Sequence, residues 1–314
     1  MVKIQRYTSN NKNKWDSFIA KAKNSHFMFY REYMDYHSDR FVDHSLVFLD
    51  KNENILGLLP ANLSDCTLYS HQGLTFGSVI IDDSVRAENV IEMFSAMKEY
   101  CARNSIEKII YKCIPYIYHT IPADEDRYAL FLNKAYLFRR DISSTIYLGG
   151  EIRYSKGRKS TVKKAQKENL KFSKSEDYEG FWQLLEGLLN QKYGRNPAHN
   201  VGEIKKLAAT FPENIHLYLV HQEEDLMAGA VLFNNTNIVH TQYLASSERG
   251  KEIGALDYLV DHLIIDSKGI YKYFDFGISN ENDGLFLNKG LILQKEGFGA
   301  RAVVHDFYEL NTVQ

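Results

Sequence analysis

Apolar residues in the first half of the chain recur with the periods of β-strands and of one α-helix. Short apolar runs that flank a polar turn, as at 46–49 and 55–59, predict a β-hairpin. Apolar residues spaced by three or four positions predict the buried face of a helix. The predicted elements of the first half are strands at 46–49, 55–59 and 67–69, a helix with Val90, Phe94, Met97 and Cys101 on its buried face, and a strand at 106–113.

The second half repeats this order of elements. Its predicted strands lie at 217–220, 226–233 and 238–245, its helix has Leu256, Leu259, Val260, Leu263 and Ile264 on one face, and its last strand lies at 271–276. Corresponding elements are separated by a nearly constant offset of about 170 residues, which is typical of duplicated domains. A chance match is the alternative, because the same elements occur in many α/β proteins. We expect two domains, 1–149 and 150–314, joined near Gly149 and Gly150.

Composition constrains the environment and the partners of the protein. Hydrophobic residues make up 44% and charged residues 25% of the 314 residues, which is ordinary for globular domains. The formal net charge is −2, so the chain as a whole gives no reason to expect nucleic-acid binding. The three cysteines lack metal-ligand spacing, so we expect neither a metal site nor a disulfide framework. Without a signal peptide or a long apolar run, a soluble, cytoplasmic protein with no transmembrane segment is expected.

Several segments resemble motifs of one group of enzymes. The strand at 273–276 with Gly277, followed by 295–299, resembles a D-F-G strand and a later K-x-G-F-G pattern, and the basic segment from Ser155 onward fits as well. Together these segments are similar to the FemAB-like and BioF2-like transferases, which carry two tandem GCN5-related N-acetyltransferase (GNAT) domains. The resemblance implies an α/β (α+β) fold with two tandem GNAT-like domains, each a mixed, mainly antiparallel sheet flanked by helices.

The same resemblance implies an activity. It implies an acyltransferase that moves an N-acyl or aminoacyl group onto an amine or hydroxyl of a sugar-nucleotide, glycan or cell-wall precursor, in cell-envelope or polysaccharide biosynthesis. Acyl-CoA or aminoacyl-tRNA is the implied donor, with no tightly bound cofactor and no DNA partner. Enzymes that use acetyl-CoA hold its pyrophosphate at the start of the main helix. Lys251 and Gly254 keep the register of that turn and are assigned to donor binding. A non-catalytic module that binds a nucleotide-sugar or RNA is the alternative.

Basic residues concentrate at the start of the second half. Nine Lys or Arg residues lie between Arg153 and Lys174, against one acid, Glu168. Like charges at i, i+4 spacing destabilise a helix, so a bound anion such as a diphosphate, a CoA phosphate or an RNA backbone would compensate them. Ser160 is the predicted N-cap of this helix. A solvated linker helix without a bound anion is the alternative. The residues assigned to the anion are Lys156, Arg158, Lys159 and Lys163.

Candidate catalytic residues lie near strand ends in both halves. In an alternating strand, Asp275 faces away from Phe274 and Phe276, and a carboxylate there can accept a proton from an attacking amine or hydroxyl. A structural role in the following loop fits Asp275 equally well. Tyr243 lies late in the third strand of the second half, and His71 occupies the equivalent region of the first half, where an imidazole can act as a base. Gln242 and Lys295 are assigned to substrate binding. Lys295 is part of the motif that resembles K-x-G-F-G.

The remaining polar candidates carry weaker patterns. Aromatic and charged residues mix over 29–41, where Arg31 and Arg40 are assigned to an acceptor pocket, although an amphipathic surface helix explains the same pattern. His199 lies in a predicted loop and, like His71, is either a base or a structural histidine. Cys113 lacks the histidine and acid of an activated thiol, so a buried structural role is expected.

Overall fold

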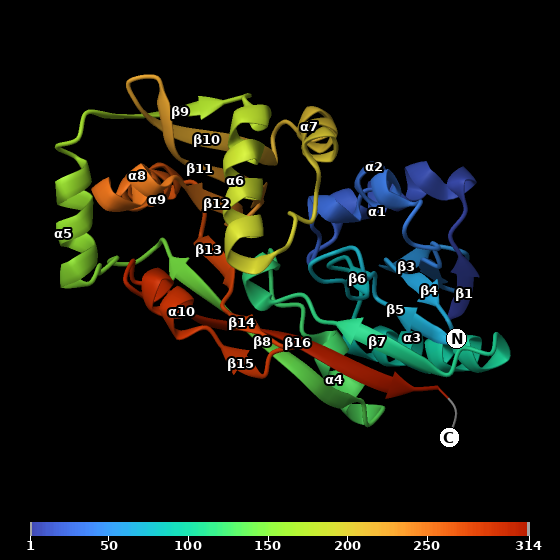
Figure 1. Ribbon diagram of the computed structural model, residues 1–314. Coiled ribbons are helices and arrows are strands. Elements are labelled where there is room, and N and C mark those ends of the chain that lie inside the picture. The colour runs from blue at the N-terminus through green and yellow to red at the C-terminus, as the bar shows by residue number, and fades with distance from the viewer. Residues whose placement is uncertain (1, 313–314) are drawn as a thin grey trace. The chain divides into compact units, whose positions relative to one another are not determined.

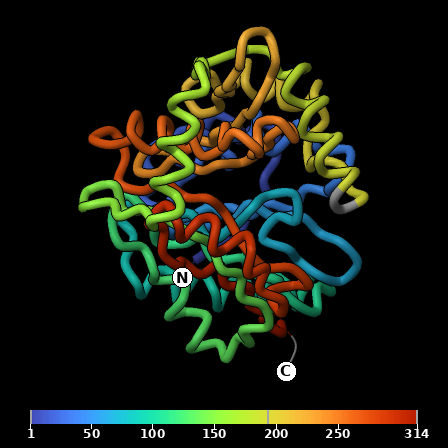
Figure 2. The backbone as a smooth tube through the Cα atoms, turned by 60° about the vertical axis from the view of Figure 1, so that its left-hand side comes forward, coloured from blue at the N-terminus to red at the C-terminus, as the bar shows by residue number. Residues whose placement is uncertain are grey.

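The chain folds into two compact units. The computed structural model describes residues 2–312 (Figure 1). The first unit extends to Asp141 and includes Asn282–Phe286 and the residues from Val304 onward, and the second contains Ile142–Glu281 and Leu287–Val303. This division differs from the predicted one at 149 and 150, since the join lies earlier and the chain returns to the first unit near its end. In Figure 2 the late segments are the red part of the trace.

The helices and strands follow one another in this order. The first unit has β1 (Lys3–Arg6), α1 (Lys12–Lys21), α2 (Arg31–Met34), β2 (Leu46–Leu49), β3 (Ile55–Leu59), β4 (Asn62–Ser64), β5 (Thr67–Tyr69), β6 (Ile80–Ile81), α3 (Ala87–Arg103), β7 (Lys108–Lys112) and α4 (Glu125–Leu132). β8 (Tyr136–Tyr147) and β16 (Arg301–Asn311) contribute residues to both units. Between them lie α5 (Lys156–Ala165), β9 (Leu170–Ser175), α6 (Tyr178–Tyr193), α7 (Val201–Thr210), β10 (Ile215–Gln222), β11 (Asp225–Asn235), β12 (Ile238–Ser246), α8 (Glu248–Ile253), α9 (Ala255–Ser267), β13 (Tyr273–Ile278), β14 (Asn280–Glu281), β15 (Phe286–Leu287) and α10 (Lys289–Glu296).

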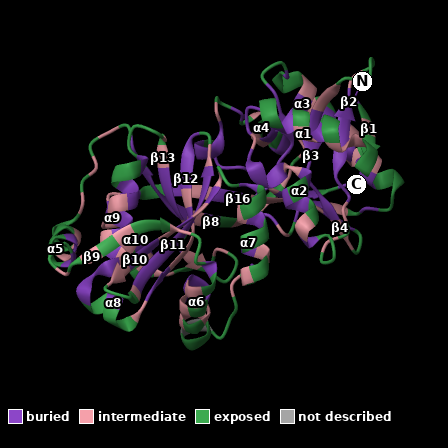
Figure 3. Ribbon diagram, turned by 90° about the horizontal axis from the view of Figure 1, so that it is seen from above, coloured by how far each residue is buried: buried purple, intermediate pink, exposed green. Residues whose placement is uncertain are grey.

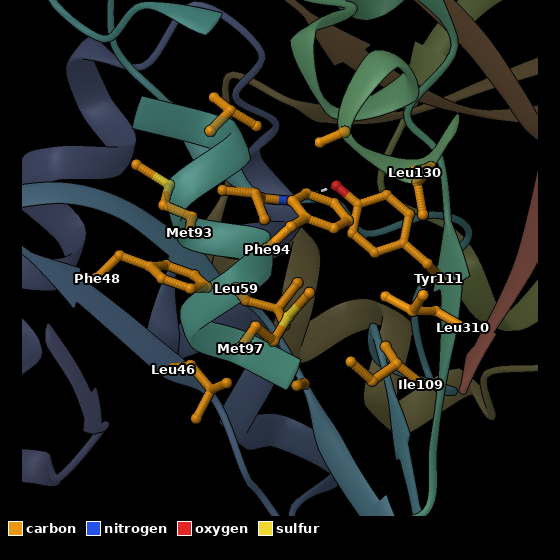
Figure 4. Close-up of a cluster of buried hydrophobic side chains, with 14 of the residues drawn as sticks. Leu46, Phe48, Leu59, Met93, Phe94, Met97, Ile109, Tyr111, Leu130 and Leu310 are labelled. Atoms are coloured by element: carbon orange, nitrogen blue, oxygen red, sulfur yellow. Dashed lines mark hydrogen bonds between the residues drawn. The ribbon is translucent and has the colours of Figure 1, made fainter. Parts of the chain in front are cut away.

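In the first unit, apolar residues of the strands pack against α3. One sheet has the strand order β1-β2-β3-β6, and β4, β5, β7 and β16 follow one another in a second sheet. The face of α3 that carries Phe94 and Met97 packs with Phe48 of β2 and with Ile109 and Tyr111 of β7 (Figure 4). These side chains are fully or almost fully buried, as their helical and alternating spacing predicts.

In the second unit, neighbouring strands in the order β8-β13-β12-β11-β10-β9 carry helices on both faces. Ala228 and Ala230 of β11 share the apolar cluster of Leu259 in α9. Gly229 between them points to the opposite face, where a Cβ would lie 2.4 Å from a ring carbon of Phe181 in α6. Small residues in β11 therefore let a helix approach each face of the sheet closely. Figure 3 shows these central strands in the colour of buried residues.

The predicted repeat is present in both units. The hairpin β2–β3 and the hairpin β10–β11 are antiparallel, as expected. In each unit a parallel pair then follows, β5 with β7 and β12 with β13, and each pair is matched over three residues. One difference concerns the first unit, where β5 lies in a different sheet from β2 and β3.

Two local expectations differ from the structure. α5 begins at Lys156, and the side chain of Ser155, rather than Ser160, accepts a hydrogen bond from the Arg158 amide at 3.2 Å. The segment between β12 and α9, expected as a phosphate-binding turn, forms the short helix α8 instead. Ser247 caps α8, because its hydroxyl accepts from the Gly250 amide at 3.0 Å.

The core of the first unit gives a stability prediction. Phe94→Ala removes a buried ring and leaves a cavity, so the free energy of unfolding should fall by about 3–5 kcal/mol. Phe131→Ala, which truncates an exposed ring of the same type, should change it by less than about 0.5 kcal/mol. Urea unfolding followed by circular dichroism measures both values. Equal losses in the two variants would contradict this packing.

Candidate functional site

The candidate site of the second unit lies where two parallel strands separate. β12 and β13 pair over three residues, ending with His240 opposite Asp275. Beyond this pair β12 continues along β11 to Ser246, and β13 continues along β8 to Ile278. Gly277 has φ +74°, which favours glycine, and the pairing of β13 with β8 shifts register there. His240 and Asp275 therefore occupy the point at which the two strands diverge.

Asp275 is held by several donors. Its side chain is fully buried, with 0% of its surface exposed. The hydroxyls of Ser143 and Thr145 in β8 donate to Oδ1 at 2.5 and 2.7 Å, and the amide of Gly277 donates to Oδ2 at 3.2 Å. A buried carboxylate is costly unless its oxygens are hydrogen-bonded, and these three donors offset that cost. Both oxygens of the buried Asp275 side chain thus accept hydrogen bonds.

His240 completes the cluster. Its Nδ1 lies 2.8 Å from Oδ2 of Asp275. Because that carboxylate oxygen accepts hydrogen bonds, the pairing favours a proton on Nδ1 and leaves the lone pair of the neutral ring on Nε2. A Cβ on Gly277 would approach the His240 ring to 3.1 Å, so the glycine also makes room for the imidazole. This is the arrangement in which an acid orients a histidine as a proton acceptor.

The sequence singled out Asp275 as a candidate but did not single out His240. The two residues are 35 positions apart, and only the parallel pairing of β12 with β13 brings them together. No short motif links a histidine in one strand to an acid in the next. The sequence repeat was the one signal that could have indicated His240. It aligns the third strands of the two halves, so residues near the ends of these strands occupy equivalent positions.

Lys295 lies next to this cluster and ties down the end of β13. From α10 its Nζ donates to the carbonyl oxygens of Gly277 and Ile278 at 2.8 and 2.7 Å. Burial lowers the pKa of Lys295 to about 8, against an opposing effect of the Asp275 charge. The predicted role of Lys295 in substrate binding stays a prediction.

Tyr243 and His199, which the sequence suggested separately, lie together. The Tyr243 hydroxyl is 2.7 Å from Nδ1 of His199 and accepts the His199 amide at 3.2 Å. The indole of Trp182 in α6 donates to the His199 carbonyl at 3.0 Å and packs edge-on against the Tyr243 ring. These contacts fix the loop between α6 and α7 to β12. The predicted catalytic role of Tyr243 stays a prediction.

Gln242 interrupts the regular pairing of β12. The register with β11 passes from Tyr243 opposite Val231 to Thr241 opposite Leu232, so Gln242 is the extra residue of a β-bulge. Bulges re-aim neighbouring side chains and are frequent beside active sites. This bulge begins two residues after His240, on the stretch of β12 that β13 no longer accompanies.

The segment assigned to the donor is packed against α5. Gly254 has φ +81° and separates α8 from α9, and a Cβ there would lie 2.7 Å from Cγ2 of Thr161 in α5. The requirement for glycine is thus explained by the backbone conformation and by the approach of α5. The Lys251 ammonium forms an ion pair with Glu248 in the same helix. Donor binding by Lys251 and Gly254 stays a prediction.

Arg158 connects α5 to the first turn of α9. Its guanidinium forms an ion pair with Asp257, lies 4.5 Å from the centre of the Phe298 ring, and donates to the Gln294 carbonyl at 3.2 Å. Burial raises the pKa of Asp257, and the positive charge of Arg158 opposes that rise. The Arg158 guanidinium, which the sequence assigned to an external anion, therefore already binds Asp257 and the Gln294 carbonyl within the unit. By contrast, Lys156, Lys159 and Lys163 of α5 are exposed.

Three candidate residues of the first unit are buried and contact other residues of the protein. His71 is only 3% exposed, its Nδ1 accepts the Gly73 amide at 3.2 Å, and burial lowers its pKa to about 2. Such an imidazole stays neutral and does not suit the role of a base near neutral pH.

Arg31 is also buried and forms ion pairs with Asp35 at 2.5 Å and Asp43 at 3.1 Å, which corrects its assignment to an open acceptor pocket. Cys113 is buried, as expected, and burial raises its pKa well above the usual range.

Arg40 is the more accessible of the two arginines assigned to the acceptor. Its guanidinium lies 5.5 Å from the centre of the Tyr36 ring and 3.9 Å from the Asp39 carboxylate. Its part in acceptor binding stays a prediction.

The strand separation of the first unit differs chemically from that of the second. The pairing of β5 with β7 ends at Tyr69, which lies opposite Ile110. In the repeat, Tyr69 corresponds to His240 and Ile110 corresponds to Asp275. Beyond them the following segment bonds to β7, because the Ser70 hydroxyl accepts the Lys112 amide at 2.7 Å and the Gly77 amide donates to the Lys112 carbonyl at 3.0 Å. The first unit thus lacks this acid–histidine pair, and its own chain lies beside β7.

Metal clusters and membrane spans are not found within residues 2–312. No group of three or more histidine, cysteine or acidic side chains in this part of the chain has a metal-binding arrangement. None of the described helices combines the length and apolar character needed to cross a bilayer.

The buried ammonium of Lys295 gives a pH prediction. Its folded-state pKa of about 8 lies below the ordinary value of 10.5. Between these pH values the unfolded state binds more protons, so the stability contributed by this position rises with pH. The stability of the wild type relative to Lys295→Met should increase by on the order of 3 kcal/mol from pH 8 to pH 10.5. Urea unfolding of both proteins over this range checks the change, and a constant difference would contradict it.

Comparison with known proteins identifies the fold. No protein-family model and no curated protein matches the sequence. Among solved structures, FemX is similar over 97% of this chain and 96% of its own, with a TM-score of 0.66 and 11% identity. The C-terminal domain of a putative lysylphosphatidylglycerol synthetase from Agrobacterium fabrum is similar over 96% of this chain and 92% of its own, with a TM-score of 0.61 and 10% identity.

A third similar structure carries the fold in its name. A tandem GNAT protein from the clavulanic acid biosynthesis pathway is similar over 100% of this chain and 99% of its own, with a TM-score of 0.53 and 7% identity. Identities this low establish the fold alone. The expected fold is confirmed: the chain is a mixed α/β protein with the FemAB-like double GNAT fold.

Proposed function

We propose that the protein is an acyltransferase whose chemistry takes place in the second unit, with His240 as the general base. The observation that carries this proposal is the hydrogen-bonded pair of His240 and Asp275 at the point where β12 and β13 separate. A histidine oriented by a buried carboxylate is suited to take a proton from an attacking amine or hydroxyl. The fold shared with FemX supports acyl transfer as the reaction class.

The proposed reaction moves one proton through the imidazole. Nε2 of His240 accepts the proton of the acceptor amine or hydroxyl while its nitrogen or oxygen attacks the carbonyl carbon of the donor. Asp275 stabilises the imidazolium that forms. When the intermediate collapses, the bond to the leaving oxygen breaks, and the imidazolium returns the proton to that oxygen. Backbone amides of β12 beyond His240 are the proposed donors to the oxyanion.

We further propose that the acyl group arrives on an RNA rather than on CoA. A pyrophosphate at the start of α9 would meet the carboxylate of Asp257, which is paired with Arg158, and the approach would be narrowed by Thr161 of α5. The outer face of α5 instead offers Lys156, Lys159 and Lys163 to solvent, and such cations neutralise a phosphodiester backbone. Of the two expected donors, aminoacyl-tRNA fits these contacts better than acyl-CoA does.

The proposed acceptor carries an amine or hydroxyl on a sugar-nucleotide, glycan or cell-wall precursor. The name of the lysylphosphatidylglycerol synthetase indicates an aminoacylated lipid headgroup as the product of that protein. A polar acceptor of this general kind suits the bulge at Gln242, which lies beside the proposed base. Tyr243 and His199 would hold the neighbouring loop in place during binding.

Substitution of the proposed base gives an activity prediction. His240→Gln keeps the size of a polar side chain but removes the proton acceptor, so the rate of transfer should fall by about 100- to 10,000-fold. Asp275→Asn should also lower the rate, because an amide no longer stabilises the imidazolium. The assay offers radiolabelled aminoacyl-tRNA and acetyl-CoA separately to a panel of amino-sugar nucleotides and cell-wall precursor peptides, and it counts label on the acceptor.

A second histidine of the same unit provides the control for this assay. His221→Gln, in β10, removes a histidine from the same unit away from Asp275 and should leave the rate unchanged. Transfer from aminoacyl-tRNA and none from acetyl-CoA supports the proposed donor. Equal rates in His240→Gln and the wild type would overturn the base. Binding of RNA without transfer to any acceptor would favour the non-catalytic alternative.

A further inference from the structure

The helix–strand segment 128–140 of the first unit exposes an unusual set of large apolar side chains. On α4, Ala129 and Leu130 are buried, whereas Tyr128, Phe131 and Leu132 lie on the exposed face. Phe131 is 74% exposed. An amphipathic helix on a globular core carries polar residues on its outer face, so α4 departs from that pattern. Figure 3 shows exposed segments on this helix.

The strand that follows continues the exposed apolar surface. A tight turn joins the two elements, because the Lys134 amide donates to the Phe131 carbonyl at 3.0 Å. In β8, Tyr136 is 69% exposed and Phe138, two residues later on the same side of the strand, is also exposed. Monomeric proteins rarely expose clustered apolar groups of this size unless the cluster meets a partner.

Another hairpin adds to the surface beside β8. Arg139 forms an ion pair with Asp283 at 2.6 Å, and a Cβ on Gly284 would lie 2.6 Å from the Arg140 carbonyl, so 283–284 touches this strand. The adjoining Leu285 and Phe286 are exposed. Three segments of the first unit, α4, the start of β8 and residues 285–286, thus present apolar side chains to solvent.

The charges within 128–140 are all positive. This stretch contains Lys134, Arg139 and Arg140 and no acidic residue. Arg139 and Arg140 are paired with carboxylates from outside it, at 2.8 Å to Asp141 and 2.5 Å to Asp306. Lys134 is exposed at the turn, and no ion pair to it is formed by a residue within 2–312. Lys134, which lies between Phe131 and Tyr136 in the sequence, is therefore available to an outside anion.

We propose that this segment, which we call the apolar tip and define by Tyr128, Phe131, Leu132, Lys134 and Tyr136, docks the protein on an anionic lipid surface. Tyr and other amphipathic rings favour the headgroup level of a bilayer, Phe and Leu favour the acyl boundary, and lysine is attracted to anionic headgroups. A second copy of the chain fits less well, because self-association would bring two Lys134 ammoniums toward one apolar face. This inference is independent of the proposed acyl transfer.

Vesicle binding by the full chain tests the proposal. The probes are vesicles of phosphatidylglycerol and phosphatidylcholine in equal parts and vesicles of phosphatidylcholine alone, with binding measured by co-sedimentation. The wild type should bind the anionic vesicles, and the combined variant Phe131→Ser, Leu132→Ser and Tyr136→Ser should bind at least about tenfold more weakly. Lys134→Glu should weaken binding to the anionic vesicles and leave binding to the neutral ones unchanged.

Matched controls keep the result interpretable. Ile270→Ser combined with Leu293→Ser removes two exposed apolar side chains from the second unit and should bind the anionic vesicles like the wild type. Because all these side chains are exposed, circular dichroism and urea unfolding should be unchanged in every variant. Binding that is absent in the wild type, or equal in the wild type and the combined variant, overturns the proposal. A wild-type dimer that the combined variant splits would assign the tip to self-association instead.

Discussion

A buried carboxylate organises the second unit. Asp275 is isolated from water, and its stability depends on donors from two other elements, the hydroxyls of Ser143 and Thr145 in β8 and the imidazole of His240 in β12. The same oxygens accept the Gly277 amide, which holds the bend of β13. The hydrogen bonds that satisfy this one charge therefore fix the strand positions around the separation and the orientation of the histidine.

The two units share a backbone plan but differ at the point where their parallel strands separate. Both units have a three-residue parallel pair followed by strand separation, but Tyr69 and Ile110 stand in the first unit where His240 and Asp275 stand in the second. In the first unit the chain beyond Ser70 bonds to β7, whereas in the second unit Lys295 of α10 bonds to carbonyl oxygens at the end of β13. The same backbone plan thus supports a closed scaffold in one copy and an acid–histidine pair in the other.

Periodicity predicted the elements well, and the site only in part. The hairpins, α3 and α9 follow from apolar spacing, because burial of one face is a local property of the sequence. Apolar spacing did not predict the short helix α8, because α8 is stabilised by the Ser247 cap and by packing against α5. Likewise, the partner of Arg158 could not be inferred from a run of basic residues, because Asp257 reaches it only through the packing of α5 on α9. The sequence did not single out His240 for the same reason, because its contact with Asp275 depends on the pairing of β12 with β13.

The state of the His240 ring tests the central claim most directly. Nitrogen-15 NMR of protein with labelled histidine distinguishes which ring nitrogen carries the proton in the neutral form. If Asp275 orients the imidazole, the wild type should have its proton on Nδ1 and the lone pair on Nε2, and Asp275→Asn should lose that preference. A wild-type ring protonated on Nε2, or one unaffected by Asp275→Asn, would contradict the account.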